Sequence, residues 1–323
     1  MNPPIPAGVT SQLGANAGSG VAGTAGGASV GATSRMALVR ARLALPVVRQ
    51  AAGLFEGAHT SILTGKGHDF EDLTGYVPGD DVRDIEWKVS ARVGSPVIKR
   101  FERETDVFTQ LVVDTGREML AVTPSSENKE EVALVAAETL AFLSSQRGDR
   151  LGLTMGDSSG IEHFPGRHGL AHLEHVLRRA QVRLSEGRGS SRVSDLLEYV
   201  LRTTRERSLV ILVTDQFWPQ PGDDMALRRV RTRHELLVVR VADMPLTQEN
   251  VDDMVEIDGD IPLPAYVRDD AVFRHELMAD RQMWEERSAA VLRAHEVLHA
   301  PVSSSADVLP AIMGLLRRQH HAR

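Results

Sequence analysis

The sequence predicts an α/β protein with a doubly wound, mostly parallel sheet, and two observations carry this prediction. Phe108–Asp114 and Leu209–Asp215 are short, predominantly apolar runs that end in aspartate. Segments with the helical spacing of apolar residues lie between these runs and further runs of the same kind. Strands that are apolar on both sides, with helices between them, indicate a sheet that is covered on both faces.

The other elements follow from the same two periodicities. Glu130–Gln146 is a predicted helix, because its apolar residues recur at intervals of three and four. Arg150–Gly156 is a predicted strand, and Ile161–Phe164 is its predicted hairpin partner across a turn rich in Gly and Ser. The remaining predicted elements, in chain order, are the helices Leu170–Val182 and Val193–Arg205, the strand Glu235–Val241, the helix Ala271–Ala294, the strand Glu296–Val302 and the helix Ala306–Gln319.

Composition divides the chain of 323 residues into three parts. Residues 1–34 carry no charged side chain and are mostly small, so they bury too little apolar area to offset their ordering entropy and are predicted to form a disordered tail. Residues 35–106 begin with a predicted amphipathic helix, Arg35–Phe55, and continue in a charged block rich in turn formers. Residues 107–323 form the predicted α/β domain.

Charge and composition exclude several classes of function. The net charge of −7 gives no general attraction to phosphate backbones, so we expect no nucleic-acid partner. No apolar run approaches the roughly 18 residues that a membrane span needs, and the N-terminus does not resemble a secretory signal, so we expect a cytoplasmic protein without direct membrane insertion. The absence of cysteine excludes disulfides and thiolate metal sites.

The first candidate site lies where the buried strands end. Ligands of doubly wound sheets bind beyond the carboxyl ends of the strands. Asp114 and Asp215 each close a strongly apolar strand. We therefore expect these two carboxylates to contribute to a shared site at one edge of the sheet.

The second candidate site is the charged block between Gly65 and Arg92. Seven carboxylates alternate there with Arg83 and Arg92, around the turn Pro78-Gly79-Asp80. One interpretation is an internally paired surface around an aromatic anchor made of Trp87, Phe70 and Tyr76. The other is a cation site or a surface that docks a partner.

The same block resembles the signature of a known family. The matching residues are Phe70-Glu-Asp-Leu, then Tyr76-x-Pro78-Gly79-Asp80-Asp81-x-Arg83-x-Ile85-Glu86-Trp87, then Ala91-Arg92, and finally Val97-Ile-Lys-Arg-Phe-Glu. This pattern is similar to that of the domain of unknown function 58 family. The resemblance implies that the block precedes a von Willebrand factor A-like domain, which has the doubly wound sheet predicted above.

The resemblance also implies a metal-ion-dependent adhesion site after the first strand, with the pattern Asp-x-Ser-x-Ser. This chain has Asp114-Thr-Gly-Arg117-Glu118, so both serine ligands are replaced, and only serines, including Ser191, lie where a threonine ligand is expected. We expect no tightly bound metal, with Arg117 neutralising Asp114 and Asp215. Alternatively, Asp114, Glu118 and Asp215 could hold Mg²⁺ or Ca²⁺.

These features predict a binding protein without catalysis of its own. The resemblance implies an adaptor that works with a MoxR-type AAA+ ATPase in the chaperone-like maturation or assembly of client protein complexes. The expected docking residues are Asp114, Arg117, Glu118, Ser191 and Asp215 at the sheet edge, and Asp80, Asp81, Arg83, Trp87 and Arg92 in the charged block. The alternative is a metal-dependent hydrolase that uses Asp80, Asp81, Asp84 and Glu86 to activate water.

Overall fold

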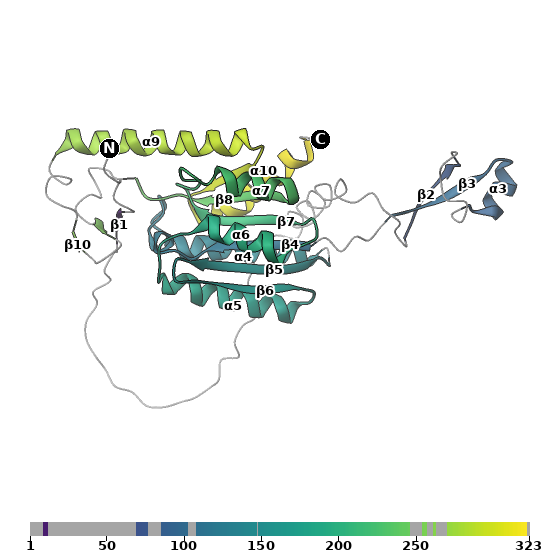
Figure 1. Ribbon diagram of the computed structural model, residues 1–323, viewed down its shortest axis with the longest axis horizontal. Helices are drawn as coiled ribbons and strands as arrows, with labels where there is room; N and C mark the ends of the chain where they lie inside the picture. The colour runs from purple at the N-terminus through teal and green to yellow at the C-terminus, as the bar shows by residue number, and fades with distance from the viewer. Residues whose placement is uncertain are drawn as a thin grey trace, which may run out of the picture.

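A computed structural model describes residues 9–11, 69–76, 85–102, 108–146, 148–245, 254–256, 261–262 and 270–321. Its largest feature is a six-stranded sheet in the order β11-β8-β7-β4-β5-β6 (Figure 1). The strands are β4 (Phe108–Asp114), β5 (Arg150–Asp157), β6 (Gly160–Arg167), β7 (Leu209–Asp215), β8 (Glu235–Val241) and β11 (Leu298–Val302).

The sheet is parallel except at one edge. β4 lies at its centre and pairs in parallel with β5 on one side and β7 on the other. β8 and β11 continue the parallel pairing, whereas β6 runs antiparallel to β5 as its hairpin partner. Every residue of β4, β7 and β8 is buried, which explains why their sequences are apolar on both sides.

Helices cover both faces of the sheet, as the apolar strands require. One core layer joins the sheet to α4 (Lys129–Gln146), α5 (Leu170–Glu186) and α10 (Ser305–His321). The other joins it to α6 (Val193–Thr203), α7 (Asp224–Arg233) and the C-terminal end of α9 (Ala271–Ala294). The predicted doubly wound α/β fold is therefore confirmed.

A smaller unit contains part of the charged block. β2 (Asp69–Gly75) pairs antiparallel with β3 (Val97–Glu102), and α3 (Trp87–Val93) lies between them in the chain. The Glu86 side chain caps the first turn of α3 by accepting a hydrogen bond from the backbone N–H of Lys88, and Gly94 ends the helix with a φ of +78°.

Only three residues of the N-terminal segment 1–34 are described. They form a short strand, β1 (Val9–Ser11), which pairs antiparallel with β9 (Met254–Glu256), and β9 also pairs with β10 (Ile261–Pro262). The rest of the segment that was predicted to be a disordered tail lies outside the described residues. The predicted helix Arg35–Phe55 lies outside the described residues.

Candidate functional site at the carboxyl edge of the sheet

Three neighbouring strands, β5, β4 and β7, end in aspartate at the same edge of the sheet. These residues are Asp157, Asp114 and Asp215, and all three are buried. β4 and β7 are direct neighbours, so Asp114 and Asp215 end adjacent strands. Asp157 falls at the turn that the sequence predicts after the strand Arg150–Gly156.

Asp114 is fully buried between backbone and hydroxyl donors. Its Oδ1 accepts a hydrogen bond from the N–H of Gly116 at 3.0 Å, and its Oδ2 accepts one from the hydroxyl of Thr214 at 2.8 Å. Burial raises the pKa of Asp114 to about 6, and the negative charge of Glu118 adds to this. Hydrogen bonds from Gly116, Ser191 and Thr214 act in the opposite direction and stabilise the carboxylate.

The loop before α6 closes tightly over the residues that follow β4. The Glu118 carboxylate accepts hydrogen bonds from the backbone N–H of Ser191 at 2.9 Å and from its hydroxyl at 3.0 Å. The N–H of Arg117 donates to the carbonyl of Gly189 at 2.8 Å. A Cβ atom on Gly116 would lie 2.3 Å from the Ser191 hydroxyl oxygen and 2.6 Å from a Glu118 carboxylate oxygen. Glycine at position 116 is therefore required by this closure.

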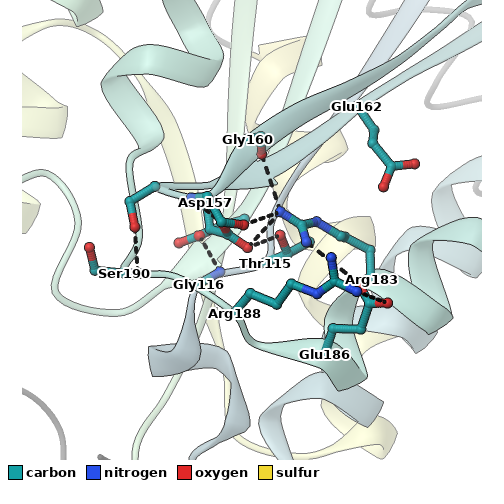
Figure 2. A network of polar contacts seen from close by, with 12 residues as sticks. Thr115, Gly116, Asp157, Gly160, Glu162, Arg183, Glu186, Arg188 and Ser190 are labelled. Carbon is teal, nitrogen blue, oxygen red and sulfur yellow. Dashed lines mark hydrogen bonds and ion pairs between the residues drawn. The ribbon is translucent and has the colours of Figure 1, made fainter.

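Arg183 of α5 contacts the end of β5 and the turn after it, beside the contacts that hold this loop (Figure 2). Its guanidinium is buried, lies 3.0 Å from the Asp157 carboxylate and donates to the Ser159 hydroxyl at 2.8 Å. Asp157 also accepts a hydrogen bond from the Thr115 hydroxyl at 3.2 Å. The neighbouring Ser158 accepts a hydrogen bond from the N–H of Ser190 at 2.9 Å, so this network ties the loop to the end of β5.

Lys129, the first residue of α4, supplies the positive charge at Asp215. Its side chain is 0% exposed, and its ammonium donates to the carboxylates of Asp215 and Asp243, the latter at 2.7 Å. Burial alone would lower the pKa of Lys129, but the two carboxylates together raise it. Burial also raises the pKa of Asp243, where the negative charge of Asp215 adds to the effect.

Sequence reasoning assigned the neutralising role at this edge to Arg117, and Lys129 was not singled out. The predicted helix began one residue later, at Glu130. One signal was present in the sequence: a lysine at the first position of a helix opposes the helix dipole and needs a nearby anion. Among the residues predicted for the sheet edge, the structure brings together Asp114, Glu118 and Ser191, and it places Arg117 in the short helix η2 (Arg117–Leu120).

The proposed ligand set Asp114, Glu118 and Asp215 does not fit a divalent cation. Asp215 already contacts the Lys129 ammonium, which would repel such an ion. Glu118 accepts the hydrogen bonds of Ser191, and Gly116 offers no oxygen where a serine ligand would stand. Within the described ranges, no group of three or more His, Asp or Glu side chains is arranged to hold a metal ion.

The charged block is described only in part, because Asp80, Asp81, Arg83 and Asp84 lie outside the described residues. Trp87 begins α3 and is 67% exposed, and Arg92 in the last turn of the helix is also exposed. The exposure of Trp87 gives no support to the interpretation in which it anchors an internally paired surface. An exposed tryptophan of this kind is compatible with a docking surface.

Comparison with known proteins gives one family and several structural likenesses. A family model described as "Protein of unknown function DUF58" matches residues 72–250. The chain is 28% identical over 215 residues to the uncharacterized protein Rv1480 of Mycobacterium tuberculosis and to the uncharacterized protein Mb1516 of Mycobacterium bovis. The match covers 65% of this chain and 66% of each relative, slightly less than two thirds of their length.

The solved structures to which the chain is similar include von Willebrand factor type A domains. BatB from Bacteroides thetaiotaomicron is 15% identical with a TM-score of 0.44, and the match covers 67% of this chain and 99% of BatB. A von Willebrand factor type A protein from Catenulispora acidiphila is 12% identical with a TM-score of 0.40, over 69% of this chain and 44% of that one.

None of the described helices combines sufficient length with sufficient apolar character to cross a bilayer.

Proposed function

The chain belongs to the DUF58 family, as the resemblance of its charged block indicated, and on this premise we propose that it is a non-catalytic protein-interaction protein. Its binding surface is the carboxyl edge of the sheet. The protein acts in the cytoplasm as an adaptor for a MoxR-type AAA+ ATPase, and the pair matures or assembles client protein complexes.

The observation that supports this proposal is that contacts within the protein already hold the side chains and the loop at this edge in place. Both flanking carboxylates have buried cationic partners, Lys129 at Asp215 and Arg183 at Asp157. The loop before α6 is fixed by backbone and hydroxyl contacts to the residues after β4 and β5. A surface held in one geometry loses little conformational entropy when a partner binds, which favours recognition.

The groups presented at this surface are polar and partly exposed. Arg117, Glu118 and Ser191 are half-buried, and Arg192 beside them is exposed. Charged groups at the rim of an interface contribute mainly to partner choice and association rate. Trp87 on α3 provides a second candidate contact of a different character, because exposed aromatic residues are frequent anchors in protein interfaces.

An affinity pull-down from the native cell tests this function. The immobilised full chain is compared with Arg117→Ala at the edge and Trp87→Ala on α3, and the enriched proteins are identified by mass spectrometry. We expect an AAA+ ATPase to be enriched by the wild type and to be depleted about tenfold or more by at least one variant, since interface anchors contribute on the order of 2 kcal/mol.

Arg205→Ala is the control, because Arg205 is an exposed arginine that lies just before β7, at the opposite edge of the sheet. It should retain the partner. The proposed partnership would be refuted if no AAA+ ATPase is enriched by the wild type. Equal loss in Arg205→Ala would refute the assignment of the binding surface.

The hydrolase alternative gains no support from the described residues. Glu86 uses its carboxylate to cap α3, and the other three proposed ligands lie outside the described ranges. We therefore do not propose it.

A further inference from the structure

The Lys129 cluster, which consists of Lys129, Asp215 and Asp243, contains a lysine with no exposed side-chain surface. Moving an ammonium group out of water costs several kcal/mol, so a buried lysine persists only where opposite charges and hydrogen bonds compensate for this cost. Its position at the first residue of α4 increases the cost further, because the positive end of the helix dipole lies there. The structure supplies two carboxylates in direct contact with this ammonium.

The cluster joins three segments that are distant in the chain. Lys129 begins α4, Asp215 ends β7, and Asp243 follows β8. The segment that contains Asp243 is held at further points: Arg281 of α9 donates to the carbonyl oxygens of Asp243 at 2.6 Å and Met244 at 3.0 Å. Asp215 also accepts a hydrogen bond from the N–H of Phe217 at 2.7 Å, which fixes the start of the next loop.

We propose that Lys129 is a covalently tethered counter-ion that performs at this edge the structural role of a divalent cation. Its ammonium gathers carboxylates from two strand ends and holds them at the start of a helix. Because this cation belongs to the chain, the edge is assembled at every concentration of Mg²⁺ or Ca²⁺. This inference does not depend on the identity of any partner.

A metal-binding experiment on the unmodified full chain provides the first test. Thermal unfolding is recorded in EDTA and in millimolar Mg²⁺ or Ca²⁺, with calorimetric titration of each ion in parallel. We expect Tm to change by less than about 1 °C, because an ion stabilises the folded state only if it binds to that state. Saturable binding with a higher Tm, both lost in Asp114→Asn at the sheet edge, would overturn the proposal.

A charge-removal series provides the second test. Lys129→Met keeps most of the side-chain length but leaves two buried carboxylates without the ammonium that contacts both of them, so we expect Tm to fall on the order of 10 °C. In Lys129→Met combined with Asp215→Asn and Asp243→Asn, all three charges of the Lys129 cluster are removed together, and most of the loss should be recovered.

The outcomes distinguish a counter-ion from a residue that only fills space. A combined variant that is as unstable as Lys129→Met would show that packing, not charge, is the role of Lys129, and would overturn the proposal. A Lys129→Met variant as stable as the wild type would do the same. Lys88→Met is the matched control, because Lys88 is exposed on α3, and its Tm should not change. If Lys129→Met does not fold at all, the metal titration of the unmodified chain still decides the question.

Discussion

Gly116 lies where a side chain would collide with the loop that closes over the sheet edge. Its φ of −61° and ψ of 158° are accessible to any residue, so backbone conformation does not require glycine there. The requirement comes from the Ser191 hydroxyl and the Glu118 carboxylate, which occupy the space of a Cβ atom. Restoring a serine ligand by mutation would therefore displace the loop that closes over the edge.

Gly116→Ser is accordingly expected to destabilise the protein by about 1–3 kcal/mol, the usual cost of overpacking a close contact. Chemical denaturation measures this change. Gly314→Ser is the control, since the only atom near a Cβ at Gly314 is the end of the Arg318 side chain at 3.6 Å. A Gly116→Ser variant with wild-type stability would show that the loop moves away without cost.

Arg183 shows how one side chain connects whole elements. It extends from α5 to Asp157 at the end of β5, and this pair borders the contacts that hold the loop before α6. The pair is almost fully buried, so removal of the guanidinium leaves a carboxylate without its cation in a site of low polarity. We therefore expect the loop to depend indirectly on Arg183, through the end of β5.

Arg183→Met is expected to lower the free energy of unfolding by about 3–5 kcal/mol and to loosen the loop of residues 187–192. Denaturation gives the first quantity, and hydrogen exchange of the loop amides gives the second. Arg178→Met on the same helix is the control, because Arg178 is exposed. Unchanged exchange in the loop would contradict the anchoring role, whatever the loss of stability.

The stability of the whole molecule depends on pH through buried groups that act in opposite directions. Burial lowers the pKa of His234 to about 4, helped by the positive charges of Arg233 and Arg207, and burial lowers that of His299 to about 4 as well. A histidine with a lowered pKa binds fewer protons in the folded state, so stability is lost as pH falls from 6.5 towards 4. Asp114, whose pKa is raised, has the opposite effect between pH 6 and 4.

His234→Gln isolates one of these contributions. The variant lacks the titrating ring, while His299 and Asp114 remain in both proteins. When the pH is lowered from 7 to 4, we expect the wild type to lose up to about 3 kcal/mol more of its unfolding free energy than the variant loses. Denaturation at a series of pH values measures it. Parallel pH profiles for the two proteins would contradict a neutral, buried His234.

Four elements have the predicted bounds: β4, β7, β8 and α9. The three strands are apolar because they are buried on both faces, whereas α9 is mostly exposed and is recognisable as a long uninterrupted helical segment. α7 (Asp224–Arg233) was not predicted, since it is short and rich in charged residues and buries only Ala226, Leu227 and Val230. Its packing on the sheet, rather than its own pattern, stabilises it as a helix.

By itself, the sequence determined the fold class, the central strands and the place of Asp114 and Asp215 at one edge, because these follow from local periodicity and from the way parallel strands align. Only the tertiary structure decided how the charges at that edge are balanced. Lys129 is separated along the chain from Asp215 by 86 residues and from Asp243 by 114 residues. Arg183 is separated from Asp157 by 26 residues (183 minus 157). Contacts over such separations form only when the chain folds. Folding brings the start of α4 to the end of β7, and it excludes water from the paired ammonium and carboxylate groups.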